Sequence, residues 1–336
     1  MTIINGIEID HVRYSTNYIK EAINNNEPME DKLNVIAVVS NPCLFAKRYI
    51  LMKEFIHRLE KEETNVRLFI VELAYNDQSF IITDKNNKRH LQLRSDCPLW
   101  HKENMINLGV KYLLPKNYKA FAWIDADIEF ENTTWALDTL KVLNGAKDIV
   151  QLFSHAVDMD NDEWAMNIFN SAGYLHTKGK PYCNKGINYY HPGFAWAITR
   201  KAFERIGGLY DKAILGSGDN IMMFSLLGNG IKAINENSTD DYKESILDFQ
   251  EKIKTLRYGY IPGVIRHYFH GSKQNRKYHE RWQILMDHEY SPNKHIKYSR
   301  NGLILPTDDF SSEFKSDIIQ YFRERNEDEG LSACTS

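Results

Sequence analysis

Short, continuous apolar runs alternate with longer segments of helical spacing through the first half of the chain, and no other feature constrains the fold as much. The runs at 33–40 (LNVIAVVS), 66–73 (VRLFIVEL) and 120–125 (AFAWID) have the length and composition of buried strands. Between them, residues 45–63 and 101–114 place apolar side chains at helical spacing. This alternation predicts an α/β fold with a mainly parallel central sheet flanked by helices.

Later segments continue the pattern with less regular spacing. Residues 133–144 are expected to form a helix with Thr133 as its N-cap, and residues 148–154 a strand. In the second half of the chain the expected elements are a strand at 194–199 and helices at 218–228, 241–253 and 274–288.

The order of these elements indicates one main domain with short flanking segments. Residues 1–31 show no sustained period and read as an irregular lead-in. The α/β domain is expected to cover residues 32–290, with a C-terminal helical extension packed on it at 291–324. The polar segment 325–336 is expected to be a disordered tail.

Composition is that of an ordinary globular protein, and it narrows the range of partners. Of the 336 residues, 43% are hydrophobic and 26% are charged, which is enough to build a sizeable core. The formal net charge is -3, and lysine and arginine are scattered rather than clustered. This argues against nucleic acid or an anionic membrane as the main partner and favours small molecules.

Two further features concern the compartment. No stretch approaches about 20 uninterrupted apolar residues, and the first residues lack the pattern of a signal peptide. The cysteines lie far apart and form no CxxC pair; they are Cys43, Cys97, Cys183 and Cys334. We therefore expect a cytoplasmic protein with no membrane span, with reduced thiols and with neither a zinc knuckle nor a disulfide framework.

Two aspartates, Asp125 and Asp127, follow the third apolar run directly. Ligands of such sheets bind beyond the carboxyl ends of the strands, and carboxylates placed there suit Mg²⁺ or Mn²⁺. The alternative is a strand-to-turn junction capped by aspartate. A second acidic cluster, DMDND at 158–162, lacks the glycine and the glutamate of a calcium loop and is expected to be a solvated loop.

Four motifs occur in an order that resembles a known family. They are LWHKENMINLGVKYLLP, FAWIDADIEFEN, HPGFAWAITRKAFERIGGLYDKAILGSGDN and FHGSKQNRKYHER. Together they resemble the nucleotide-sugar glycosyltransferases of the GT-A fold, close to the family 2-like and galactosyltransferase-like branches, over residues 33–286.

The resemblance implies a metal-dependent transfer of sugar from a nucleotide-diphospho-sugar, with a UDP-sugar favoured, to a hydroxyl of a glycan or other acceptor. It implies that Asp125 and Asp127 hold Mn²⁺ or Mg²⁺ together with His270, for which His267 is the competing ligand. It also implies the set of residues that binds the donor: Asn41, Arg48, Lys102, Asn107, Asp125, Ala126 and Asp127. Arg276 and Arg281 either face the diphosphate or lie on a solvated helix.

On the acceptor side, Asp219 in GSGD occupies the position of the catalytic base of inverting members. The commoner pattern there is Glu-Asp, and Gly218 replaces the glutamate in this chain. The residue types also make Asp219 a good helix N-cap. Tyr190, His191 and Trp196 are expected to bind the acceptor sugar, although Trp196 also suits a core position.

Three alternatives remain open at this stage. A sugar nucleotidyltransferase would need a glycine-rich basic loop after its first strand, which VVSNPCLFAKR does not supply. A non-catalytic sugar-binding module would use the aromatic residues and the metal but not Asp219. A nucleotide-sugar hydrolase would use the same chemistry with water as the acceptor.

Overall fold

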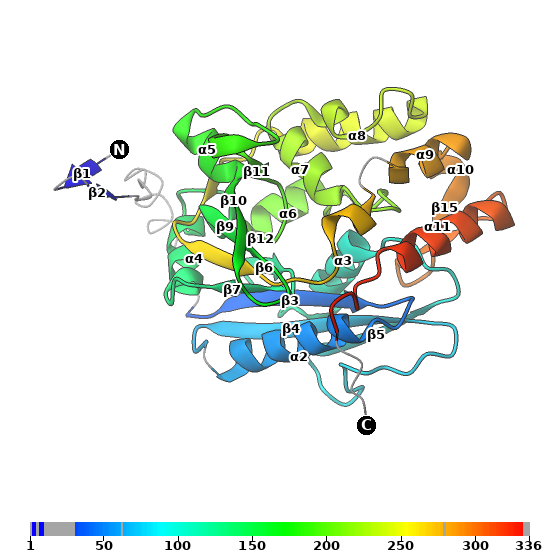
Figure 1. Ribbon diagram of the computed structural model, residues 1–336, viewed down its shortest axis with the longest axis horizontal. Helices are drawn as coiled ribbons and strands as arrows, with labels where there is room; N and C mark the ends of the chain where they lie inside the picture. The colour runs from blue at the N-terminus through cyan, green and yellow to red at the C-terminus, as the bar shows by residue number, and fades with distance from the viewer. Residues whose placement is uncertain (1, 5–6, 10–30, 62, 278–279, 332–336) are drawn as a thin grey trace.

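A seven-stranded sheet forms the centre of the protein (Figure 1). The computed structural model describes residues 2–4, 7–9, 31–61, 63–277 and 280–331. The strand order is β13-β8-β12-β6-β3-β4-β5. The bounds are β3 (Leu33–Ser40), β4 (Val66–Tyr75), β5 (His90–Ser95), β6 (Ala120–Ile124), β8 (Ile149–Gln151), β12 (Ala195–Thr199) and β13 (Tyr258–Tyr260).

Most neighbouring strands of this sheet are parallel. β3 pairs in parallel with β4 and β6, β4 with β5, and β8 with β13. β12 is antiparallel to both of its neighbours, β6 and β8. The prediction of an α/β fold with a mainly parallel central sheet flanked by helices is therefore confirmed.

Alternate residues of the central strands face two different layers of helices. Val35 and Ala37 belong to the core that includes α2 (Ala46–Lys61) and α4 (Trp135–Leu143). Ile36 and Val71 face α3 (Lys102–Leu113), in a core that also includes α6 (Arg200–Ile206), α7 (Gly218–Leu226) and α8 (Asp240–Ile253). Gly109 lets α3 approach closely, because a Cβ there would lie 3.0 Å from methyl carbons of both Ile36 and Val71.

A smaller sheet continues from the carboxyl end of β6. Its order is β11-β10-β9-β14-β7, and its strands are β7 (Ile128–Phe130), β9 (His155–Met159), β10 (Ala165–Ser171), β11 (Tyr190–His191) and β14 (Val264–His267). Asp125 and Asp127 lie where the chain passes from the large sheet to this small one. The small sheet therefore brings β14, which ends in His267, beside the aspartates.

The remaining elements lie outside these two sheets. They are the hairpin β1 (Thr2–Ile4) and β2 (Ile7–Ile9), α5 (Ala172–Lys178), η1 (Gly186–Asn188), η2 (Gly230–Ala233), η3 (Lys273–Arg276), α9 (Glu280–Asp287), α10 (Pro292–His295), β15 (Ile296–Tyr298), β16 (Ile304–Pro306) and α11 (Ser312–Glu324). Most of the predicted lead-in, residues 1–31, lies outside the described residues, as does Cys334. Cys43, Cys97 and Cys183 are free thiols.

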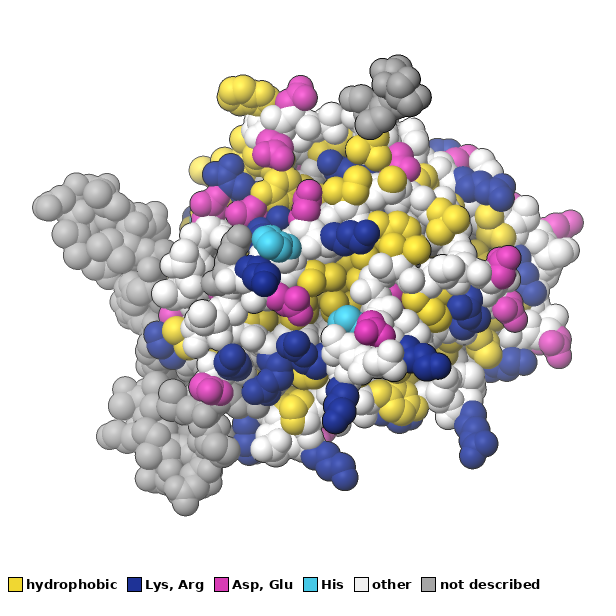
Figure 2. Space-filling view, turned by 90° about the horizontal axis from the view of Figure 1, so that it is seen from below, with side chains coloured by type: hydrophobic (Ala, Val, Ile, Leu, Met, Phe, Trp, Pro, Cys, Tyr) yellow, Lys and Arg dark blue, Asp and Glu magenta, His cyan; other side chains and the backbone are white. Residues whose placement is uncertain are grey.

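Several predicted boundaries differ from the structure. The helix expected at 133–144 begins at Trp135 with Thr134 as its N-cap, and the strand expected at 148–154 covers only Ile149–Gln151. The helix expected at 274–288 is divided into η3 and α9. No described helix is long and apolar enough to cross a membrane. On the face shown in Figure 2, basic side chains are spread among acidic and uncharged ones.

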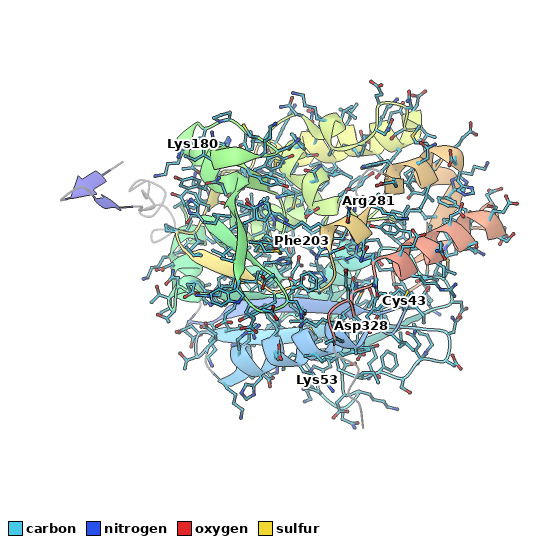
Figure 3. All side chains as sticks on the ribbon, in the orientation of Figure 1. Cys43, Lys53, Lys180, Phe203, Arg281 and Asp328 are labelled. Atoms are coloured by element: carbon cyan, nitrogen blue, oxygen red, sulfur yellow. The ribbon has the colours of Figure 1, made fainter. Side chains whose placement is uncertain are left out.

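Residues 325–331, which we call the C-terminal strap, are ordered against the domain rather than forming the disordered tail expected there. Glu327 is 1% exposed and forms ion pairs with Arg48 and Arg325. Asp328 lies at the start of α2 (Figure 3) and accepts hydrogen bonds from the backbone N–H groups of Ala46 and Lys47, at 3.0 and 2.8 Å. The strap therefore supplies the N-terminal cap of a helix that lies some 280 residues earlier in the chain.

The cap predicts a stability effect. Asp328→Ala is expected to lower the free energy of unfolding by about 1 kcal/mol, because two N–H groups at the start of α2 lose their acceptor. Urea unfolding followed by circular dichroism measures this, with Asp308→Ala, at an exposed position, as the control. An unchanged free energy of unfolding in the Asp328 variant would contradict the capping role.

Candidate active site

A cavity of about 190 Å³ opens at the carboxyl ends of β3 and β6, between the start of α3 and the C-terminal strap. Its wall combines apolar side chains from β3 and α2 with a group of charged ones. The charged and imidazole groups are Arg48, His101, Lys102, Asp125, Asp127, His270, Arg276, Arg325 and Glu327. The site therefore lies where open α/β sheets bind their ligands.

Six of the residues predicted for the donor or the metal line this cavity, and two do not. The six are Arg48, Lys102, Asp125, Ala126, Asp127 and His270. Asn41 is buried, and its side-chain amide binds the backbone N–H and C=O of Phe45 at 2.9 and 2.8 Å. Asn107 binds the backbone of Leu209 in the same two-sided way. The donor-binding roles of Asn41 and Asn107 stay predictions.

Asp127 and two histidines form the densest group of candidate metal ligands. His270 Nε2 lies 2.8 Å from Asp127 Oδ2, and His267 Nε2 lies 3.7 Å from the same oxygen. One ligand atom from each of the three residues lies within 4.8 Å of the others. His267 is the last residue of β14 and His270 lies three residues further along the chain. Both rings therefore lie next to the Asp127 carboxylate.

One oxygen of the buried Asp127 carboxylate accepts no hydrogen bond from the described residues. Its Oδ1 atom is buried and has no hydrogen-bond partner among them. Burial alone would raise the pKa of this carboxyl, but the adjacent imidazoles of His270 and His267 lower it well below its ordinary value. An ionised carboxylate with an unused buried oxygen, beside two imidazole nitrogens, is a donor set that suits a divalent cation.

Asp158 is the site residue that sequence reasoning missed. It lies at 2% exposure in β9 instead of in the solvated loop expected at 158–162. Its Oδ1 lies 2.7 Å from His267 Nδ1, and Lys273 Nζ lies 2.6 Å from its Oδ2. Because the Asp158 carboxylate binds Nδ1 of His267, the other ring nitrogen, Nε2, points towards Asp127. Carboxylates behind metal-binding histidines commonly orient the imidazole ring in this way.

His270 is held neutral by its surroundings. Burial, with a further contribution from the Arg276 guanidinium, lowers the pKa of His270 to about 4. Arg276 Nη2 lies 2.8 Å from His270 Nε2. A neutral imidazole has the lone pair that a metal ligand requires, but Nε2 lies within hydrogen-bond distance of Arg276, so a cation at Nε2 would have to displace that guanidinium.

Asp125 faces the opposite way, towards the start of α3. Its Oδ1 lies 2.5 Å from Lys102 Nζ. Burial lowers the pKa of Lys102, but the carboxylates of Asp125, Asp219 and Glu103 outweigh it and raise that pKa above its ordinary value. Lys102 is therefore a charged group shared between the two predicted sides of the site.

Asp219 lies in the first turn of α7, but it is not the N-cap expected from the sequence. Ser217 is the N-cap, with a positive φ of 76°, and its hydroxyl accepts a hydrogen bond from Arg281. Asp219 Oδ1 accepts a hydrogen bond from the N–H of Asn220 at 2.8 Å. Asp219 is therefore not the N-cap residue, although its carboxylate still accepts one N–H of the first turn of α7. Arg281 is not among the residues that line the cavity.

Gly193 brings the predicted acceptor residues to Asp219. A Cβ at Gly193 would lie 2.4 Å from Asp219 Oδ2 and 3.2 Å from His191 Cε1, so only glycine allows this approach. His191 stacks on Phe194 with ring centroids 3.7 Å apart. Trp196 is 1% exposed and stacks between Trp123 and Tyr258.

Tyr190 lies on the same side as Asp219 and is half-buried. Burial, with the Asp219 charge as a further cause, raises its pKa. The acceptor-binding roles of Tyr190, His191 and Trp196 stay predictions.

The C-terminal strap contributes two residues to the cavity wall that no sequence motif indicates, Arg325 and Glu327. The Arg48 guanidinium binds Glu327 through two nitrogens, with Nε 2.8 Å from Oε2, and Arg325 Nε lies 2.9 Å from Oε1. Arg325 also lies over the ring of Trp100, at 5.3 Å. These contacts join sequence positions far apart, so local patterns carry no sign of them.

Comparisons with solved structures find a distant structural likeness. No family model and no curated protein matches the chain. A solved structure of a Drosophila beta-1,4-galactosyltransferase 7 mutant, in complex with manganese, UDP-Gal and xylobiose, aligns with 83% of this chain and 96% of its own. The sequence identity is 12% and the TM-score is 0.38, and a likeness at that level establishes neither a shared fold nor a shared activity.

Glu103 generates a pH prediction. Burial, with the Asp219 charge as a further cause, raises its pKa to about 8, while the unfolded chain releases this proton near pH 4.3. Between these values the folded protein holds the extra proton, so wild-type stability falls as pH rises, by up to about 1.4 kcal/mol per pH unit. Glu103→Gln removes this contribution and should gain stability over the wild type from about pH 5 to pH 8.

Urea unfolding at several pH values measures the difference between the two proteins. Glu236→Gln, at an exposed position, is the control and should follow the wild-type pH dependence. Parallel curves for wild type and Glu103→Gln would show that Glu103 ionises at its ordinary pKa.

Proposed function

We propose that the protein is a metal-dependent glycosyltransferase that moves a sugar from a nucleotide-diphospho-sugar to a hydroxyl acceptor. One observation carries this proposal: Asp127 and His270 line a cavity that also presents Lys102 and Arg276, and with His267 they form a group of residues that could hold a cation. A divalent cation and basic side chains on one cavity match a diphosphate ligand. The assignment to the GT-A fold is part of the same proposal.

The metal ligands in this proposal are Asp127, His267 and His270. Two imidazole nitrogens and a carboxylate favour Mn²⁺ over Mg²⁺, because Mg²⁺ prefers oxygen ligands and water. When bound, the ion supplies positive charge against the diphosphate leaving group. Asp125 stays paired with Lys102 in the described structure, and its predicted role as a metal ligand is the part of the D-x-D assignment that this geometry supports least.

The donor would lie along the cavity. Its diphosphate would face Lys102 and Arg276 at the D-x-D end, and its nucleoside would face Arg48 and the apolar side chains of β3 and α2 at the other end. The preference for a UDP-sugar rests on the family resemblance of the motifs.

Asp219 is the catalytic base in this proposal. It takes the proton of the acceptor hydroxyl while that oxygen forms a bond to the anomeric carbon, and the bond from that carbon to the diphosphate oxygen breaks with its electron pair on the nucleotide. Its carboxylate is held at the start of α7 by the hydrogen bond from the N–H of Asn220. Tyr190 and His191 would form the floor beneath the acceptor.

Activity measurements distinguish this proposal from two alternatives, a nucleotide-sugar hydrolase and a non-catalytic sugar-binding module. A hydrolase would release free sugar and nucleotide without needing an acceptor. A sugar-binding module would bind sugar and metal with no turnover and no dependence on Asp219.

The first test concerns donor binding. UDP with Mn²⁺ should raise the melting temperature, because a ligand that binds only the folded state stabilises it, and UDP with EDTA should not. His267→Ala and His270→Ala should abolish the effect, and Asp158→Asn should weaken Mn²⁺ binding by about 10- to 100-fold by releasing His267. His57→Ala, at an exposed position, is the control. Equal stabilisation by UDP in EDTA would refute the metal site.

The second test concerns the base. Asp219→Asn preserves size, so folding and UDP binding should survive, whereas turnover should fall by about 10²- to 10⁴-fold. Consumption of UDP-galactose measured by UDP release provides the readout. Wild-type turnover in this variant would place the base elsewhere, and a product of retained configuration would exclude an inverting mechanism.

A further inference from the structure

Four large apolar side chains are exposed on the outer side of the small sheet. Trp164 is 74% exposed, Met166 53%, Ile168 57% and Ile187 90%. The first three alternate along the segment that enters and forms β10, and Ile187 lies beside them, since Asn170 Nδ2 donates to its carbonyl oxygen at 2.8 Å. Single exposed apolar residues need no explanation, but a row of this kind marks a binding surface.

The backbone of β10 is also unpaired along this row. One edge of the strand pairs with β9 from Ala165 to Asn170, with a shift in register at Met166. The other edge pairs with β11 only at Asn170 and Ser171, so that residues 165–169 have no strand partner there among the residues that the structure describes. The N–H of Ile168 donates instead to the side chain of Asn167. An open strand edge is a template for another extended chain.

Charge around this edge limits what can bind to it. Asp160, Asp162 and Glu163 form the turn that precedes β10, and residues 155–177 contain neither lysine nor arginine. Lys273 lies over the ring of Phe169 at 4.3 Å, but it is paired with buried Asp158. The acidic turn disfavours an anionic membrane surface or a nucleic acid at its end of the edge. A neutral or basic partner fits.

The open edge leads directly to the proposed base. Asn170 pairs with Tyr190 and Ser171 with His191, and His191 lies beside Asp219 across Gly193. Ile168 precedes Asn170 by two residues, which is about 7 Å along a strand. A ligand on the edge would therefore end beside the acceptor position.

We propose that the acceptor is a polypeptide that adds to the small sheet as an extended strand along residues 164–169 of β10. Its backbone would pair with the open edge, and its apolar side chains would cover Met166 and Ile168. A serine, threonine or tyrosine hydroxyl next to the added strand would then reach Asp219. This assignment of substrate class rests on the proposed glycosyltransferase function.

The unpaired edge is what selects a polypeptide over other apolar partners. A lipid chain can cover apolar side chains, but it cannot satisfy backbone N–H and C=O groups in register. The acidic turn adds a preference for peptides that carry lysine rather than glutamate.

The test uses synthetic peptides of about ten residues, longer than the open edge, with one serine between alternating valine and lysine. Binding is measured by fluorescence anisotropy without donor or metal, on wild type, Ile168→Lys and Leu247→Lys. Leu247 is 42% exposed on α8, so its substitution is a matched control for an added surface charge. Ile168→Lys should weaken binding by at least about tenfold, and Leu247→Lys should not change it.

Backbone pairing is tested separately from side-chain contact. The same peptide with N-methyl groups on alternate residues should lose binding, and hydrogen exchange at residues 165–169 should slow only with the unmethylated peptide. Equal binding of both peptides, equal binding to both lysine variants, or binding of neutral lipid vesicles in place of the peptide would overturn the proposal. So would a concentration-dependent dimer that Ile168→Lys dissolves, because a second copy would then occupy the edge.

The outcome also separates this proposal from the proposed function. Peptide binding is measured without donor, so its loss leaves the UDP and Mn²⁺ results untouched and refutes only the peptide acceptor. A peptide that binds the edge but receives no sugar from UDP-galactose with Mn²⁺, as seen by mass spectrometry, refutes its role as acceptor while the docking edge stands.

Discussion

The structure around the cavity depends on the groups that balance the negative charge of two neighbouring carboxylates at the end of β6. Asp125 and Asp127 lie in the turn directly after β6, and their side chains have different partners. Lys102 at the start of α3 neutralises Asp125, and His267 and His270 surround Asp127. Because uncompensated buried charge is unstable, the positions of α3 and of the loop after β14 are tied to these two residues.

The compensation of Asp127 extends outward through a second carboxylate. His267 lies between Asp127 and Asp158, and Lys273 balances Asp158 from the loop that follows His270. The chain segments that carry these groups come from β9 and β14, which pair in parallel, with His267 opposite Asp158. The small sheet is thus the scaffold that places the imidazoles, and the order of its strands matters more to the site than its size.

The sequence predicts those parts of this arrangement that rest on local pattern. The runs that became β3, β4 and β6 are short and largely apolar, and the D-x-D follows one of them directly, so the position of the aspartates at a strand end could be predicted. Asp158 could not, because its role depends on a contact with His267 across 109 residues, and its acidic neighbours look like a solvated turn. The order of the C-terminal strap could not be predicted for the same reason. Its polar composition is typical of disorder, and the contacts that hold it in place are with Arg48 and the start of α2, far away in the sequence.

Lys102 couples the donor side of the site to the acceptor side electrostatically. Its ammonium touches Asp125, and the carboxyl groups of Asp219 and Glu103, which belong to the acceptor side, are close enough to act on it electrostatically. Gly218 allows this convergence, because a Cβ there would lie 2.4 Å from the carboxyl of Glu103. A negatively charged ligand in the cavity would compete with Asp219 for the same cation. In the proposed reaction, a diphosphate bound beside Lys102 would therefore act electrostatically on the carboxylate that must accept the proton, and this coupling needs no movement of the backbone.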